Sequence, residues 1–284
     1  MISRIVRTMK RSGLATFALT LEASLTATAV LAQPAEDETQ KAAKVALDLR
    51  NPVATLVSLH LENNWDFGYG NSQAIAYTAI CIPVVPFSLS PDWNLITRTI
   101  IPSIYAEPVA KSGTSHSGLG DIVATIYLSP NQPAHGWYWG AGPGLILPSA
   151  TDRLLGAGKW SAGPTLAVLR QDGPWTAGAL TGHAWSFAST YAGSAVSTTH
   201  LQPFLSFTTG QDTTFGVDTT AEYDWKWRQW TVPLEVSISQ VLTVARQDIE
   251  LGLVGRWYAE RALGGPQWGL SFTITFSFPK KPAN

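Results

Sequence analysis

Apolar and polar side chains alternate with a period of two along most of the chain after residue 52, most clearly near the C-terminus. The segment 267–278 places Trp268, Leu270, Phe272, Ile274, Phe276 and Phe278 against Gly269, Ser271, Thr273, Thr275 and Ser277. Segments 213–226, 229–241 and 248–260 alternate in the same way. Because successive side chains of a β-strand point to opposite faces, each segment is predicted to be a strand with one apolar and one polar face.

The alternation and the turn residues between segments predict about twelve strands in all. They lie near 53–66, 73–88, 94–106, 118–129, 137–148, 159–170, 175–188, 199–209, 213–226, 229–241, 248–260 and 267–278. Each is long enough to cross a bilayer at a tilt, which takes about 9–11 residues. An even number of strands would return both ends of the chain to the periplasm.

The strands of a soluble β-sandwich also alternate between apolar and polar side chains, but two features favour a membrane barrel. Short gaps between the predicted strands, such as 90–92 and 171–174, interleave with longer ones, such as 108–117 and 150–158, although the last two gaps of the longer series are short. Tryptophans also collect at strand ends, where an aromatic girdle would meet the lipid headgroups. These are Trp93, Trp137, Trp160, Trp175, Trp185, Trp225, Trp230, Trp257 and Trp268. The predicted fold is therefore all-β, a transmembrane antiparallel up-and-down β-barrel over 52–279 with a tail at 280–284.

The composition agrees with apolar residues that are dispersed over strands. Hydrophobic residues make up 45% of the chain and charged residues 14%, yet after the N-terminal region no run approaches the roughly 18 apolar residues of a spanning helix. The formal net charge of −1 gives no basic surface for a nucleic acid. Cys81 is the single cysteine, which excludes an intrachain disulfide.

The N-terminus has the order of a secretory signal. Basic residues between Arg4 and Arg11 precede a mostly apolar run that ends near Leu31, and Ala32 is the predicted cleavage position. Residues 1–32 are therefore predicted to be a signal peptide, and the bacterial outer membrane is the predicted location. Residues 33–51 are expected to be a periplasmic leader. Val45 and Leu49 give it one narrow apolar helical face, and a loosely ordered leader is the alternative.

Several motifs resemble one family. They are Asn51-Pro52-Val53-Ala54, Asn63-Asn64-Trp65-Asp66-Phe67-Gly68, the run from Pro83 to Pro102, Gly118-Leu119-Gly120-Asp121, the run from Gly140 to Leu169, Gln202-Pro203-Phe204 and Trp230-Thr231-Val232-Pro233-Leu234. The chain from about Asn51 to Pro279 resembles the bacterial outer-membrane proteins grouped as "meta-pathway of phenol degradation" transporters, often automatically named "neuromedin U". The resemblance implies a barrel with a transport role. Such barrels tend to end near a terminal aromatic residue. Here Pro279 to Asn284 follow Phe278, and this departure weakens the expected signal for the assembly machinery.

The polar face of the predicted strands carries the charged residues that would line the lumen. The candidates are Arg98, Asp121, Asp218, Glu222, Asp224, Lys226, Glu235, Glu250, Arg256 and Glu260. Charged rings of this kind select or orient a permeant in many pores. The alternative is that these side chains pair with one another and plug the barrel, and a barrel of about twelve strands lies between filled and open sizes.

No pattern of catalytic or metal-binding residues emerges. The five histidines, His60, His116, His135, His183 and His200, are scattered, without the spacing of a zinc site. Gly140 to Gly144 lacks the Lys-Ser/Thr of a phosphate-binding loop. We therefore expect no catalytic residues, no metal and no cofactor.

Three functions remain open at this stage. The first is a passive channel or transporter for small, apolar or aromatic molecules, the second is a closed structural or interaction barrel, and the third is a lipid-modifying enzyme. The expected partners are outer-membrane lipids, the barrel-assembly machinery during biogenesis, and a small-molecule permeant in the first case.

Overall fold

A computed structural model describes residues 36–108, 113–191, 195–245 and 247–278. The predicted signal peptide 1–32 and the tail 280–284 lie outside the described residues. The chain divides into two units, Met1–Asp37 and Glu38–Asn284. The following description concerns the second unit.

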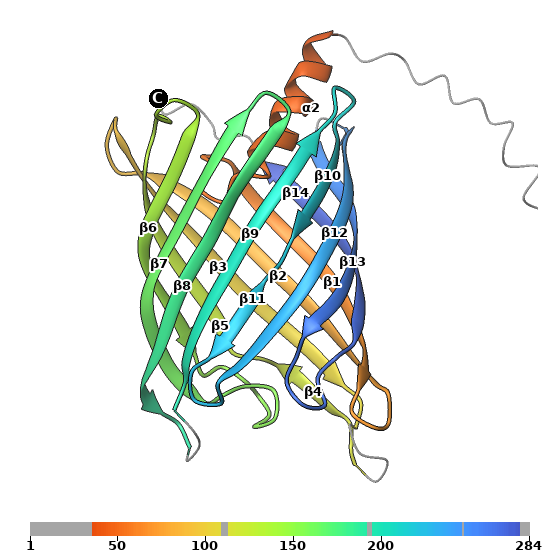
Figure 1. Cartoon of the computed structure of the whole chain (residues 1–284). Coiled ribbons are helices and arrows are strands. Elements are labelled where there is room, and N and C mark those ends of the chain that lie inside the picture. Colours follow the sequence, from red (N-terminus) through yellow and green to blue (C-terminus); the bar gives the residue numbers. More distant parts are fainter. Residues whose placement is uncertain (1–35, 109–112, 192–194, 246, 279–284) are drawn as a thin grey trace, which may run out of the picture. The chain divides into compact units, whose positions relative to one another are not determined.

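The second unit is built almost entirely of antiparallel strands that wrap around a central axis (Figure 1). One helix, α2 (Glu36–Asp48), precedes them. The strands are β1 (Val57–Tyr69), β2 (Ala74–Ser88), β3 (Trp93–Ala106), β4 (His116–Leu119), β5 (Ile122–Pro130), β6 (Trp137–Leu147), β7 (Lys159–Asp172), β8 (Trp175–Ser189), β9 (Ser197–Thr208), β10 (Thr213–Asp218), β11 (Ala221–Asp224), β12 (Gln229–Val244), β13 (Gln247–Glu260) and β14 (Trp268–Phe278).

The sheet closes on itself because β1 pairs with β2 on one side and with β14 on the other. β4 and β5 both pair with β3, and β10 and β11 both lie between β9 and β12, so each of these pairs is one interrupted strand. The result is a closed antiparallel barrel of twelve strands, which confirms the predicted fold class. Closure removes the unpaired strand edges that lipid could not satisfy.

The two faces of the strands differ as the alternation predicts. On β14, Ser271, Thr275 and Ser277 point inward and are buried, whereas Trp268, Leu270 and Phe278 are exposed on the outer face. All nine tryptophans of the predicted girdle are 37–59% exposed, so they also face outward. Trp93, Trp137 and Trp175 begin strands at the end of the barrel where β1 begins, and Trp160, Trp185, Trp225, Trp230, Trp257 and Trp268 lie near the other end.

The first strand begins later than the pattern predicts, at Val57 rather than near residue 53. The preceding residues turn into the barrel instead. The Asn51 side chain accepts a hydrogen bond from the backbone amide of Val53 at 3.0 Å, which stabilises a local turn at Pro52. This turn directs residues 49–56 toward the lumen.

Candidate functional site

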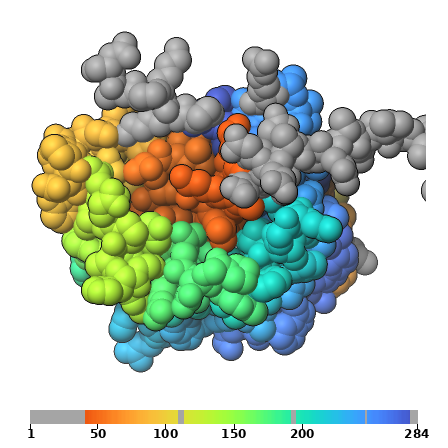
Figure 2. Space-filling model, turned by 90° about the horizontal axis from the view of Figure 1, so that it is seen from above, coloured from red at the N-terminus to blue at the C-terminus, as the bar shows by residue number. Residues whose placement is uncertain are grey.

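The helix α2 packs against the inner surface of the barrel. Ala42 and Ala46 form a small buried cluster with Val241 of β12, and Val45 and Leu49 pack at its edge. Because these helical positions recur every three or four residues, they form one apolar face. Figure 2, a view onto this end, shows the chain that follows α2 filling the mouth of the barrel. We call residues 41–56 the plug segment.

Ion pairs tie the plug segment to β13. Lys41 Nζ lies 3.3 Å from Asp248, and the guanidinium of Arg50 is paired with Glu250. Glu250 is 4% exposed and also accepts a hydrogen bond from Ser239 at 2.7 Å. A buried carboxylate needs partners of this kind because its desolvation is costly. Glu250 was predicted to line the lumen, and the structure places it there as an anchor for Arg50.

The tip of the plug segment inserts into an apolar cluster inside the barrel. Val53 is 4% exposed and packs among inward-facing side chains of β3, β5, β7 and β8, which are Ile96, Tyr127, Ala167, Leu169 and Leu180. Gln171 of β7 also donates a hydrogen bond to the backbone oxygen of Leu47 at 2.8 Å. The segment is therefore held by apolar contacts on one wall and by ion pairs on the other.

The inner face of β6–β8 also carries few bulky side chains. Six glycines alternate on its inner face, Gly140, Gly142 and Gly144 on β6, Gly163 on β7 and Gly178 and Gly182 on β8. A Cβ atom at Gly142 would lie 2.0 Å from the backbone oxygen of Ile126, so this close approach of strands requires glycine. This side of the lumen is consequently lined by glycines and small side chains, Ser161, Thr165 and Ala167 among them, and by the apolar cluster around Val53.

The opposite wall carries a dense polar network. Arg256 of β13 donates to Glu235 at 2.5 Å and to Asp66 at 3.0 Å. Tyr258 donates to the same Asp66 at 2.9 Å, and Arg256 also reaches Asn64 at 3.3 Å. Such a cluster satisfies each buried charge internally. Of the predicted lumen residues, Glu235 and Arg256 thus face inward but neutralise each other.

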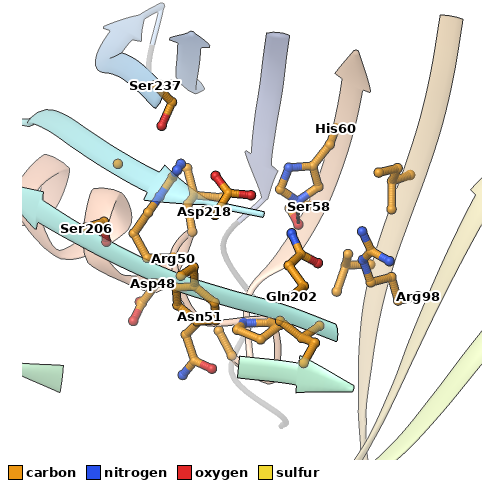
Figure 3. Close-up of a pocket in the computed structure, with 18 of the residues that line it drawn as sticks. Asp48, Arg50, Asn51, Ser58, His60, Arg98, Gln202, Ser206, Asp218 and Ser237 are labelled. Carbon is orange, nitrogen blue, oxygen red and sulfur yellow. Dashed lines mark hydrogen bonds between the residues drawn. The ribbon is translucent and has the colours of Figure 1, made fainter. Parts of the chain in front are cut away.

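A cavity of about 220 Å³ lies between the plug segment and the barrel wall. Its polar lining comes from the plug segment and from five strands, and Figure 3 shows Gln202 and Asp218 on one side with Arg98 across from them. Among the described residues, the Arg98 side chain has no hydrogen bond or ion pair. Apolar lining is provided by Val84, Leu180 and Phe204. The cavity therefore offers an apolar surface and an uncommitted guanidinium.

The far mouth of the barrel is narrowed by the segment 148–158. Asp121, between β4 and β5, accepts hydrogen bonds from the amides of Ala150 at 3.2 Å and Ala157 at 2.7 Å. His116 Nδ1 lies 2.8 Å from Asp152. The backbone amide of Leu154, and then His116, hold the pKa of Asp152 below its usual value. Asp121, predicted to line the lumen, thus fixes the segment at its mouth.

The remaining predicted residues lie near the same mouth. Glu222 and Asp224 of β11 occupy inward positions, opposite Thr231 and Gln229 of β12. Lys226 lies in the exposed turn that follows, and Glu260 ends β13 within 3.5 Å of Gln229.

Several lumen residues were not predicted from sequence. On β1, Ser58, His60, Glu62, Asn64 and Asp66 point inward. Their alternation with Leu59, Leu61 and Trp65 could have revealed them. Arg50 could not have been found in this way, because it belongs to no strand.

Within the described ranges, no helix has the length and hydropathy needed to cross a membrane. The same part of the chain contains no group of three or more His, Cys, Asp or Glu side chains placed to hold a metal ion.

A closed antiparallel barrel with an apolar outer face and tryptophans near both ends belongs to the class of outer-membrane β-barrels. The sequence profile described as "Putative MetA-pathway of phenol degradation" matches residues 55–208. The chain belongs to this family, because the match spans more than half of its length. A search of curated proteins by sequence finds no significant match.

Solved structures with the same fold are outer-membrane proteins. An outer membrane channel from Pseudomonas putida has a TM-score of 0.63 and 15% identity, over 79% of this chain and 96% of that one. The NanC porin has a TM-score of 0.49 and 12% identity, over 78% and 100%. Outer membrane phospholipase A from Escherichia coli has a TM-score of 0.46 and 10% identity, over 77% and 92%. The barrel fold indicates an outer-membrane location.

Proposed function

We propose that the protein is a passive channel for small molecules with an apolar or aromatic body. The observation that carries this proposal is the division of the lumen into two unlike walls. Apolar side chains, small side chains and glycines, together with Arg98, line β3 and β5–β8, whereas the other wall carries paired charges on β12, β13 and β1. Membership in a family associated with phenol degradation and the similarity to an outer membrane channel support the same function.

An apolar permeant gains from such a wall because its apolar surface is removed from water there. It would pass the segment 148–158, follow the glycine-lined wall and enter the cavity beside Arg98. There the free guanidinium and Gln202 can bind a polar substituent by charge-assisted or neutral hydrogen bonds. No step requires a catalytic residue, and the proposal assigns none.

The plug segment must change its position or conformation before a solute can pass through the barrel. It lies in the mouth of the barrel and contacts both walls. The contacts that hold it also favour a second candidate function, a closed barrel that serves a structural or interaction role. The two candidates differ in one measurable property, the flux of solute through the folded protein.

The test is conductance in planar bilayers together with flux of a small aromatic solute and an equally sized sugar into liposomes. We expect measurable conductance and faster flux of the aromatic solute. Leu180→Asn on the apolar wall should lower aromatic flux several-fold, since it replaces a buried apolar contact. Thr273→Asn on the polar wall is the matched control and should leave the preference unchanged. A folded protein with neither conductance nor flux would establish the closed barrel instead.

A further inference from the structure

An aromatic patch lies on the outer surface of the barrel, at the end opposite the one where β1 begins. It consists of His183 and Trp185 of β8, Tyr223 of β11, Trp225 just after β11 and Trp230 of β12. The ring centroids of His183 and Trp185 are 4.1 Å apart, and Tyr223 lies 4.9 Å from both Trp225 and Trp230. Register pairs Tyr223 with Trp230, so the rings form one continuous surface.

Polar groups lie within this patch. Trp225 Nε1 donates to the hydroxyl of Thr199 at 2.8 Å, and the same hydroxyl lies 2.7 Å from His183 Nδ1. Ser197 Oγ lies 3.3 Å from His183 Nε2. Hydrogen-bonding groups on a lipid-facing surface are costly in hydrocarbon. The patch therefore fits the headgroup level of the membrane, where polar ligands are available.

The turn between β11 and β12 places positive charge beside the patch. Lys226 and Arg228 are exposed there, and neither forms an ion pair among the described residues. Asp224 fixes the turn by accepting hydrogen bonds from the amides of Lys226 at 2.7 Å and Trp227 at 3.0 Å. Arg228 completes the turn in the left-handed region, with a φ of 52°. The two cations are thus held in a defined turn, close to Asp224 but without an ion pair among the described residues.

The other end of the barrel lacks this combination. Trp93 and Trp139 form an edge-to-face pair with centroids 5.9 Å apart, but the nearby cation, Arg170, is already paired with Asp172 at 3.0 Å. Both ends of the barrel therefore carry tryptophans on the outer surface. Within the described residues, basic groups without an ion pair lie beside these rings only at the end opposite the one where β1 begins.

We propose that the aromatic patch, with Lys226 and Arg228, binds the phosphorylated amino-sugar headgroup of a glycolipid in the outer leaflet. Aromatic faces suit the C–H surface of a sugar ring, and Arg and Lys suit phosphate. Thr199, Ser197 and His183 supply hydrogen bonds to sugar hydroxyls. This inference rests on the outer-membrane location and not on permeation, so it stands or fails independently of the channel function.

The test uses the full folded protein in detergent, with lipid binding measured by native mass spectrometry. The probes are lipid A with both phosphates and the same lipid without phosphates. We expect tighter binding of the phosphorylated form. The double variant Lys226→Gln/Arg228→Gln should bind it about thirtyfold more weakly, since each cation near an anionic headgroup contributes about 1 kcal/mol. Arg170→Gln is the matched control and should bind both lipids as the parent protein does.

A second variant tests the rings separately from the charges. Trp225→Leu removes one ring and its hydrogen bond to Thr199, and should weaken both lipids several-fold while the phosphate preference remains. Folding of each variant is checked by the heat-dependent gel mobility of the barrel. Equal binding of the two lipids by the parent protein would overturn the proposal. So would unchanged binding in the folded double variant, or an equal loss in Arg170→Gln.

Discussion

The ion pair between Arg50 and Glu250 offers the sharpest test of how the plug segment is held. We consider Glu250→Gln, which keeps the size of the side chain and removes its charge. Glu250 is 4% exposed and the Arg50 side chain 24%. After the substitution, the guanidinium of Arg50 remains in the barrel without its counter-charge, while the hydrogen bond from Ser239 can persist.

Removing one partner of a fully buried ion pair typically costs 3–5 kcal/mol. The partial exposure of Arg50 lets water solvate part of the remaining charge, so we take a smaller loss of about 2 kcal/mol. This loss acts on the equilibrium between the docked and the released plug segment. It corresponds to a shift of about thirtyfold toward release.

The assay is single-channel recording in planar bilayers, with the ratio of conducting to closed time as the readout. Glu250→Gln and Arg50→Gln should each raise this ratio, and the charge-exchanged double variant Arg50→Glu/Glu250→Arg should partly restore it. Arg170→Gln breaks an exposed pair, with side chains 50% and 74% exposed, and should have no effect. Unchanged gating in both single variants, with the barrel folded, would refute the reasoning.

Three further predictions concern single carboxylates. Glu222 faces the lumen without an ion pair among the described residues, so Glu222→Gln should reduce cation preference, measured as the reversal potential in a salt gradient; an unchanged potential would count against its lining role. Burial raises the pKa of Asp48 above its usual value, an effect that Lys44 partly opposes. Docking of the plug segment is therefore favoured at a pH below the pKa that Asp48 has in the released segment. It weakens as the pH rises through the pKa that Asp48 has in the docked segment. Asp48→Asn should therefore lengthen closed times at neutral pH, with no difference from the parent protein in acid, whereas the exposed Asp92→Asn should match the parent throughout. Asp121→Ala removes two of the hydrogen bonds that hold segment 148–158 and should speed proteolytic cleavage there; equal cleavage rates would show that the other contacts are sufficient to hold it.

The sequence by itself determined the strands, their number and their outer face. A period of two is a local property, and a run such as Trp268 to Phe278 shows which side chains share a face without any knowledge of the neighbouring strand. Closure follows from the same pattern, because an apolar outer face requires lipid and lipid tolerates no open edge. The family resemblance, drawn from motifs spread over the barrel, is confirmed by the family match.

Only the tertiary structure decided what lies inside the barrel. Arg50 meets Glu250 and Arg256 meets Asp66 across about 200 and 190 residues of sequence, and no local pattern encodes such pairs. The sequence could name Glu235 and Glu250 as inward-facing but could not show that arginines neutralise them. It also missed the apolar wall, because strands such as β3 and β5 are apolar on both faces and their alternation is weak. Local geometry determines which side chains share a face of a strand, whereas the contacts across a lumen depend on how the closed sheet brings distant strands together.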